Sequence, residues 1–243
     1  MTSRAPLPYV TESFLCRLDA AIANKHLLTH PFYQAWNQGT LSLEALQDYA
    51  CQYYNHVAAF PTYLSALHSR IADPELRKPI LQNLIEEEGG SPNHPELWLR
   101  FAQGLGLTKS QVLNAAVQPE TANCVATFRA LCSQGHFTRG LAALYAYESQ
   151  IPEVSETKIA GLRKHYGICD AETWRYFSVH IEADKAHREQ EKQLLVQTVC
   201  NEEFATDALE AARQALEALW NLLSGVCRRH HIPCAARNEA VRL

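Results

Sequence analysis

The sequence lacks any run of about 18 apolar residues, so we expect no segment that spans a membrane. Its first nine residues lack the apolar core of a secretion signal. Basic residues are not in excess, and a formal charge of −4 gives no reason to expect binding to nucleic acid or to a membrane surface. We therefore expect a cytoplasmic protein.

No Cys-x-x-Cys pair occurs among the eight cysteines, which argues against a zinc ribbon, an iron–sulfur cluster or a disulfide scaffold. Without a secretion signal, these cysteines are expected to be reduced and mostly buried. Cys234 stands near the end of the chain, where it could be exposed and reactive.

No convincing alternation of apolar and polar residues predicts a β strand, and no Ser/Gly-rich linker divides the chain. Helical periodicity recurs instead from end to end. The sequence therefore predicts one all-α domain over residues 1–243, with a flexible basic tail over 228–243. The predicted helices are Thr11–Leu28, His30–Asn37, Leu43–Ile71, Pro74–Glu88, Pro95–Gly104, Lys109–Val117, Glu120–Gln134, Thr138–Ile151, Ser155–His165, Asp170–Cys200 and Thr206–Arg229.

The most informative stretch is His180-Ile-Glu-Ala-Asp184-Lys-Ala-His187. The segment Asp170–Cys200 contains no Gly or Pro and is predicted to be one helix, with Asp170 as its N-cap. At about 100° per residue, offsets of four and seven return to within about 60° of the start. Two imidazoles and a carboxylate thus share one side of a helix, next to an apolar stripe. We interpret the trio as metal ligands, against the alternative of a solvated polar face.

Three ligands on one helix leave a transition metal undercoordinated, so further donors should lie on other helices. Glu148 falls on the apolar stripe of its helix, where a carboxylate is costly unless it is paired or bound to metal. The run Glu86–Glu88 ends another helix, against the helix dipole, and His94 begins the next. Helical periodicity does not choose among the three glutamates, although it mildly favours Glu88 as the most central.

Six such donors, three carboxylates and three imidazoles, suit two transition metals such as iron or manganese better than one zinc ion. Binuclear sites of this kind commonly activate dioxygen.

The spacings Glu87-x6-His94, Glu148 and His180-x3-Asp184-x2-His187 resemble the haem-oxygenase-like dimetal oxidases. Within that family the chain is most similar to the p-aminobenzoate synthases related to the chlamydial death-domain-associated protein. The stretch from Glu87 to Trp98 and the phrase Tyr-Glu-Ser-Gln-Ile-Pro around Glu148 carry the resemblance, which extends from about residue 14 to residue 220. It selects Glu87 from the acidic run.

The resemblance implies a haem-oxygenase-like bundle of seven to eight core helices, often a homodimer, around two iron ions or one iron and one manganese. It implies that dioxygen and an external reductant are consumed and that p-aminobenzoate is made for folate biosynthesis. Tyr33 matches the tyrosine that supplies the aromatic ring, and Lys158 matches the lysine proposed to supply the nitrogen. Tyr49 and Tyr147 match further tyrosines expected to line the site. The related pyrroloquinoline quinone synthases and thiaminase II enzymes share the fold without this ligand set.

Alternatives to this interpretation differ in fold or in substrate. A ferritin-like bundle would need a second Asp/Glu-x-x-His pair, which the sequence lacks. A haem oxygenase would bind haem through His26 or His30 and leave six apparent ligands unexplained. A dimetal oxidase acting on an external aromatic or amine would not depend on Tyr33. A death-domain interaction module would have no use for buried metal ligands.

Overall fold

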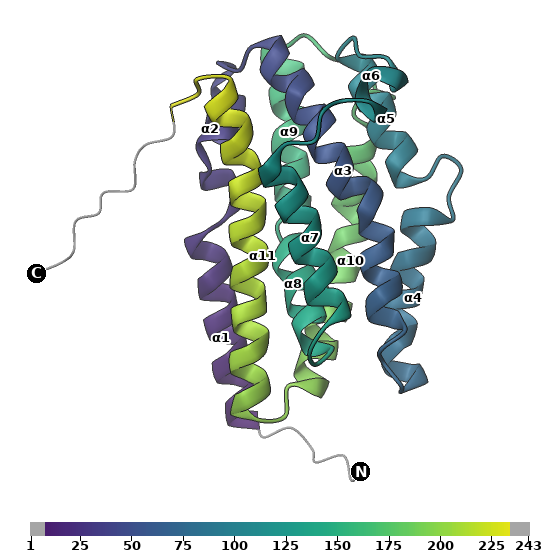
Figure 1. The fold of residues 1–243 in the computed structure, drawn as a ribbon, viewed down its shortest axis with the longest axis vertical. Helices are drawn as coiled ribbons and strands as arrows, with labels where there is room; N and C mark the ends of the chain where they lie inside the picture. The colour runs from purple at the N-terminus through teal and green to yellow at the C-terminus, as the bar shows by residue number, and fades with distance from the viewer. Residues whose placement is uncertain (1–7, 234–243) are drawn as a thin grey trace, which may run out of the picture.

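The computed structural model describes residues 8–233, and most helices of this part run along one long axis (Figure 1). No strand occurs among these residues, and the all-α prediction is confirmed. The helices are α1 (Pro8–Asn24), the 3-10 turn η1 (Leu27–Thr29), α2 (Pro31–Gln38), α3 (Leu43–His68), α4 (Pro74–Glu88), α5 (His94–Gly104), α6 (Lys109–Leu113), α7 (Pro119–Ser133), α8 (Thr138–Glu148), α9 (Ile151–His165), α10 (Arg175–Thr198) and α11 (Glu202–Arg229).

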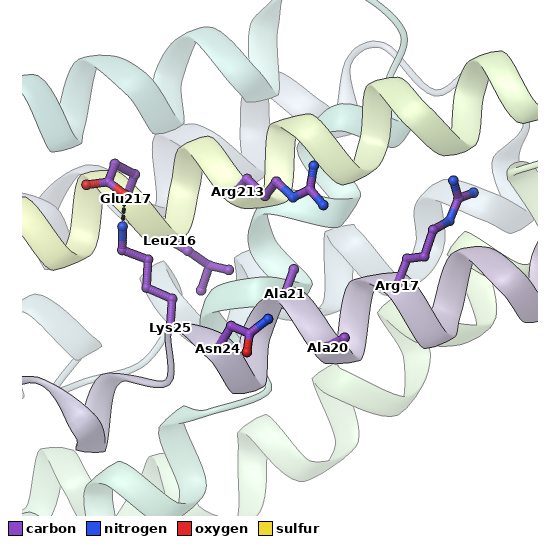
Figure 2. A pocket seen from close by; sticks show the side chains of 8 residues that line it. All are labelled: Arg17, Ala20, Ala21, Asn24, Lys25, Arg213, Leu216 and Glu217. Atoms are coloured by element: carbon purple, nitrogen blue, oxygen red, sulfur yellow. Dashed lines mark ion pairs between the residues drawn. The ribbon is translucent and has the colours of Figure 1, made fainter. Parts of the chain in front are cut away.

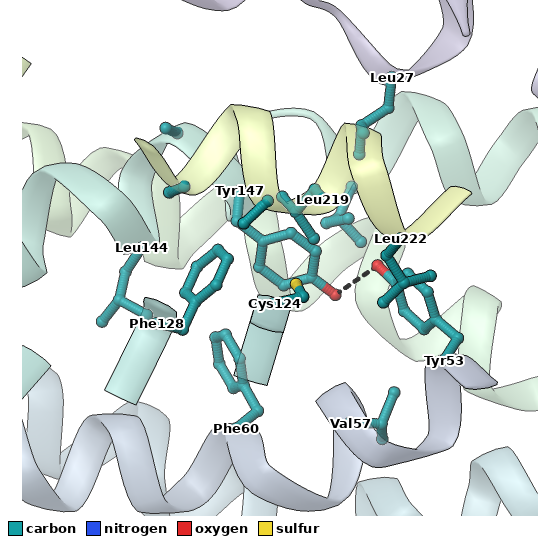
Figure 3. Packing of buried hydrophobic residues seen from close by; sticks show 14 of the residues in the cluster. Leu27, Tyr53, Val57, Phe60, Cys124, Phe128, Leu144, Tyr147, Leu219 and Leu222 are labelled. Carbon is teal, nitrogen blue, oxygen red and sulfur yellow. Dashed lines mark hydrogen bonds between the residues drawn. The ribbon is translucent and has the colours of Figure 1, made fainter. Parts of the chain in front are cut away.

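Packing among the long helices builds one continuous core. Helix α11 packs against α8, α7 and α1, whereas α3 packs against α7, α4 and α5, and α10 against α9 and α8. Figure 3 shows the layer in which side chains of α3, α7, α8 and α11 meet. Large aromatic rings fill this layer, and such rings remove the most apolar area from water per residue. Its labelled members include Tyr53, Val57, Phe60, Cys124, Phe128, Leu144, Tyr147, Leu219 and Leu222.

The seven cysteines of the described part are free thiols. Cys51, Cys124, Cys132 and Cys227 are buried, as expected, whereas Cys16 and Cys169 are exposed. Cys234 lies outside the described residues.

Two helix boundaries near the predicted site differ from the sequence prediction. Helix α10 begins at Arg175, because the Asp170 carboxylate accepts from the backbone of Thr173 and holds a turn before the helix. Pro152 does not end a helix but stands in the first turn of α9, where its missing N–H costs nothing. Glu148 is thus the last residue of α8, and α9 begins three residues later.

The face that α4 turns inward also differs from the prediction. The mild preference for Glu88 takes Leu81 and Ile85 as the core side of the helix, but these two residues are 40% and 52% exposed. Ile80, Asn83 and Glu87 are buried instead. Two of the three buried residues of α4 are polar, so the apolar residues do not mark the buried face of this helix. For this reason periodicity favoured Glu88 over Glu87.

The predicted basic tail begins later than expected. Helix α11 continues to Arg229, and Arg228 pairs with Glu120 while Arg229 pairs with Asp48. The prediction of a flexible end from residue 228 was therefore wrong as far as residue 233, and residues 234–243 lie outside the described part.

Between residues 8 and 233, each helix is too short or too polar to cross a lipid bilayer.

Candidate metal centre

Four helices bring the six predicted ligands together in the interior of the bundle. Glu87 lies at the end of α4, His94 starts α5, Glu148 ends α8, and the other three share one side of α10. All six are buried. Their donor atoms form two groups, Glu87 with His94 and His180, and Glu148 with Asp184 and His187; within each group the atoms lie within 4.8 Å of one another. Each group has the size and chemistry to hold one metal ion.

The first group is organised around the Glu87 carboxylate. Nδ1 of His94 is 2.8 Å from Oε2, and Nε2 of His180 is 3.8 Å from Oε1. His180 donates from Nδ1 to the backbone carbonyl of Tyr176 at 2.6 Å, which turns its Nε2 toward the carboxylate. Burial would raise the pKa of Glu87, but the hydrogen bonds from His180 and His94 outweigh it and lower that pKa to about 2. The carboxylate is thus fully ionised at neutral pH.

In the second group, Nδ1 of His187 lies 3.4 Å from Oε1 of Glu148 and 3.4 Å from Oδ1 of Asp184. Asn83 on α4 donates to Oε1 of Glu148 at 2.9 Å and fixes that carboxylate. Burial lowers the pKa of His187, but the neighbouring carboxylates of Asp184 and Glu148 prevail and raise it to about 11. In the absence of metal, a protonated imidazole therefore compensates the carboxylates around it.

Unsatisfied carboxylate oxygens surround the second group. Oε2 of Glu148, Oδ2 of Asp184 and both oxygens of Glu191 are shielded from solvent and accept no hydrogen bond from the described residues. Burial, followed by the charge of Glu148, raises the pKa of Glu191 well above its usual value. Oxygens in this condition are costly unless a cation binds them, so the donor set fits metal ions.

One enclosed cavity connects the two groups. Its lining contains Glu87 and His180 from the first group and Glu148 and Asp184 from the second, together with Val57, Phe60, Tyr147 and Tyr176. The predicted convergence of Glu87 and Glu148 on the α10 imidazoles is therefore present.

A series of tyrosines leads from this cavity to Tyr33. Tyr147 lines the cavity, and Tyr53 donates to its hydroxyl at 3.1 Å. The ring of Tyr53 lies 5.2 Å from that of Tyr49, whose hydroxyl is 3.2 Å from the hydroxyl of Tyr33. Burial raises the pKa of each of these four phenols, so all are neutral at physiological pH. Neutral phenols in contact can pass an electron and a proton along the series.

Lys158 lies in a cage of aromatic rings next to the same tyrosines. Its Nζ lies between 4.8 and 5.7 Å from five ring centroids, which belong to Tyr33, Tyr49, Tyr53, Trp98 and Phe177. No carboxylate of the described residues pairs with it. Burial lowers the pKa of Lys158 to about 7, so a large part of the amine is neutral near neutral pH.

Of the residues that the resemblance places at the site, Tyr147 lines the cavity, together with Tyr176. Among the described residues, Tyr33, Tyr49 and Lys158 are not part of the cavity lining. The hydroxyls of Tyr33 and Tyr49 contact each other, and Lys158 faces both rings.

The histidines considered as haem ligands have structural roles. His30 accepts from the backbone N–H of Phe32 through Nδ1 and caps α2, while its Nε2 is 3.0 Å from Ser224. His26 caps the η1 turn in the same way, by accepting from Leu28. These contacts occupy both ring nitrogens of His30. The sequence had not indicated this capping role.

Sequence reasoning missed four further residues of the site. Tyr53, Asn83, Tyr176 and Glu191 were not among the predicted site residues. Tyr176 and Glu191 could have been found from their spacing, because they stand four residues before His180 and four after His187 on one helix face.

Comparison with known proteins identifies the family. Residues 47–220 match the model of a family described as iron-containing redox enzymes. The chain belongs to this family. It is therefore an oxidoreductase, and its members' iron accords with the two buried groups of donors.

The chain resembles named relatives over most of its length. It is 43% identical to a 4-aminobenzoate synthase of Chlamydia pneumoniae over 225 residues, which cover 93% of this chain and 99% of the relative. It is 42% identical to a 4-aminobenzoate synthase of Nitrosomonas europaea over 234 residues, which cover 93% of this chain and 94% of the relative. The crystal structure of a TenA homologue from Pseudomonas syringae superposes with a TM-score of 0.76 at 16% identity. The match covers 91% of this chain and 93% of the homologue. The predicted haem-oxygenase-like fold is thus confirmed.

Proposed function

We propose that this oxidoreductase makes 4-aminobenzoate from its own Tyr33, with two metal ions, dioxygen and an external reductant, and that the product serves folate biosynthesis. The names of the relatives at 42–43% identity support the product. The observation that carries the self-consumption is the juxtaposition of Tyr33 with Lys158, whose Nζ lies 5.4 Å from the Tyr33 ring centroid inside a closed aromatic cage.

Glu87, His94 and His180 would hold one metal ion, and Glu148, Asp184 and His187 the other. When bound, iron, or iron with manganese, supplies the oxidising power drawn from dioxygen. In the overall change, the Cα–Cβ bond of Tyr33 breaks, Cα takes a hydrogen, and Cβ is oxidised by four electrons to the carboxylate of the product. The ring C–O bond breaks and the phenol oxygen leaves as water, a bond to Nζ of Lys158 replaces it, and a water molecule cleaves the Cε–Nζ bond and leaves a hydroxyl on Cε, an exchange without net oxidation. One dioxygen accepts the four electrons, and the external reductant supplies the electrons for further dioxygen that is consumed.

The tyrosine series gives oxidation of Tyr33 a route that needs no direct contact with the metals. Electrons leave Tyr33 through Tyr49, Tyr53 and Tyr147, each of which is buried and in contact with the next. Each phenol can release its proton toward its hydroxyl partner as it loses an electron. The dry surroundings prevent water from quenching the oxidised rings.

Lys158 is suited to provide the nitrogen. An ammonium ion has no lone pair, so the amine must be neutral to form the new bond. Burial favours the neutral form, and the five surrounding rings keep Nζ beside the face of Tyr33.

The test is mass spectrometry on protein loaded with iron, or iron and manganese, under anaerobic conditions and then given oxygen and reductant. Tyrosine labelled with carbon-13 and lysine labelled at Nζ with nitrogen-15 trace the atoms. We expect labelled 4-aminobenzoate and a peptide that has lost the side chain of residue 33. Tyr33→Phe should make none, whereas Tyr54→Phe, half-buried on the neighbouring turn of α3, should react like the parent. Product formed while Tyr33 stays intact would replace this proposal with oxidation of an external aromatic or amine.

A further inference from the structure

A groove separate from the metal centre lies between α1 and α11 (Figure 2). It encloses about 410 Å³ and is open to solvent along one side. Its lining consists of Arg17, Ala20, Ala21, Asn24 and Lys25 from α1 and the residue after it, and Arg213, Leu216 and Glu217 from α11. This volume falls in the range of pockets that take small organic molecules.

The charges around the groove leave one cation unmatched. Arg17 pairs with Glu202, at 2.7 Å between Nη1 and Oε1, and Lys25 pairs with Glu217. Arg213 pairs with no carboxylate of the described residues. Arg213 and Arg17 line the groove from opposite helices (Figure 2). A groove lined by two arginines, with one excess positive charge, favours an anion.

Arg17 offers donors that the protein does not use. Its Nε and Nη2 are shielded from solvent, yet they donate to no acceptor among the described residues. A buried donor without an acceptor costs roughly 1–3 kcal/mol. Because these two nitrogens are shielded, a ligand in the open groove reaches them only when the Arg17 side chain turns toward it, and the accessible charge of the groove is that of Arg213.

The floor of the groove is apolar. Ala20, Ala21 and Leu216 form it, and the two alanines leave room where larger side chains would close the space between the helices. At one end, the ion pair of Lys25 with Glu217 stands beside Trp220, whose ring lies 5.6 Å from Nζ of Lys25. A flat apolar group can rest on this floor while its charged end reaches the guanidinium groups.

We propose that this groove binds a small organic monoanion, a carboxylate carried on a flat apolar body. One unmatched positive charge calls for one negative charge, and a planar guanidinium suits a carboxylate through two parallel hydrogen bonds. The apolar floor selects such an anion over a bare inorganic ion. The site shares no lining residue with the cavity of the metal centre.

Isothermal titration calorimetry with 2-naphthoate tests the proposal, and amide NMR shifts locate the binding. We expect saturable binding that shifts the amides of residues 20–24. Arg213→Gln should weaken it about fivefold or more, because a charge-assisted bond is lost at an exposed position. Ala20→Phe, at an exposed position, should abolish binding by filling the floor while every charge is kept. Arg163→Gln, an exposed arginine on α9, is the matched control and should bind like the parent.

Two further probes separate the components of the proposal. Neutral 2-naphthylmethanol and inorganic phosphate should each bind at least tenfold more weakly than 2-naphthoate. The proposal is overturned if naphthoate does not bind at millimolar concentration or if Arg213→Gln and Ala20→Phe both bind it unchanged. Equal binding of either probe also overturns it, since the apolar floor or the charge would then contribute nothing.

Discussion

Glu86 accepts a hydrogen bond from Nε2 of His187 at 2.9 Å, while Nδ1 of the same ring faces Glu148 and Asp184 at 3.4 Å. The carboxylate fixes both the orientation and the tautomer of an imidazole whose other nitrogen points into the metal centre. Such outer carboxylates commonly raise the basicity of a metal-binding histidine. Adjacent residues at the end of α4 thus serve different donor groups. Glu87 belongs to the first group, and Glu86 supports His187 of the second.

Glu86→Gln should weaken metal binding at the second group, by about tenfold to a hundredfold, because His187 loses its ionised partner. Competition with a chelator of known affinity, followed by metal analysis, measures this. Glu88→Gln is the control, since Glu88 is exposed and adjacent on the same helix. Equal affinities of the two variants would show that Glu86 does not support the site.

Tyr53→Phe should slow formation of 4-aminobenzoate by about tenfold or more, because it removes the hydroxyl that contacts Tyr147. Metal content and thermal stability should change little, since the ring still packs between Tyr49 and Trp98. Single-turnover assays on metal-loaded protein measure the rate, with Tyr54→Phe as the control. A rate equal to the parent's would exclude Tyr53 from the route.

Lys158 should make stability rise with pH. Its pKa is about 7 in the folded protein and 10.5 in the unfolded chain, so the unfolded chain binds more protons between these values. Stability therefore increases across pH 7 to 10.5, and Lys158→Met should flatten the rise and stabilise the protein at pH 7 by about 3–5 kcal/mol. Urea unfolding of metal-free protein between pH 7 and 9.5 measures the difference. The exposed Lys164→Met should keep the parental slope.

His30 should make stability fall in acid. Burial lowers its folded pKa to about 4, below the unfolded value of 6.5, so the unfolded chain binds more protons between pH 6.5 and 4. Protonation also removes the lone pair that caps α2. His30→Asn keeps an N-cap acceptor. As the pH falls from 6.5 to 4, the free energy of unfolding of this variant should fall by about 3 kcal/mol less than that of the parent. Parallel acid unfolding curves for the two proteins would refute the assignment.

Glu191→Gln should stabilise the metal-free protein at neutral pH by about 1 kcal/mol or more, because burial holds the pKa of Glu191 well above its usual value and the group must bind a proton on folding, a cost that the neutral amide avoids. Differential scanning calorimetry on the metal-free protein provides the measurement. Glu189→Gln, exposed on the same helix, should leave the melting temperature unchanged. A lower melting temperature for Glu191→Gln would mean that the carboxylate has a stabilising partner.

The sequence predicted the fold class and most helices because breakers and periodicity are local signals. His180, Asp184 and His187 could be placed on one side of a helix from their spacing alone. Glu87 could not, since Leu81 and Ile85 of α4 are exposed and a rule that takes them as the core side selects Glu88. The resemblance to the family selected Glu87 because it depends on the number of residues between Glu87 and His94, which helical periodicity does not use.

Contacts between distant helices were beyond the sequence. Asn83 is hydrogen-bonded to Glu148, which lies 65 residues away along the chain, and Tyr53 is hydrogen-bonded to Tyr147, 94 residues away. No local pattern specifies such pairs. For the same reason, the contact between the Tyr33 and Tyr49 hydroxyls and the position of Lys158 over the Tyr33 ring could not be read from spacing along the chain.

Helix α4 sits at the side of the bundle, against α3, α5 and α10, yet it serves both halves of the centre. Glu87 belongs to one group of donors, while Asn83 and Glu86 steady Glu148 and His187 of the other. If this one helix swings outward, both ions lose their support in a single event. Binding and loss of the two metals are therefore expected to be coupled, and a half-filled protein should be a short-lived species.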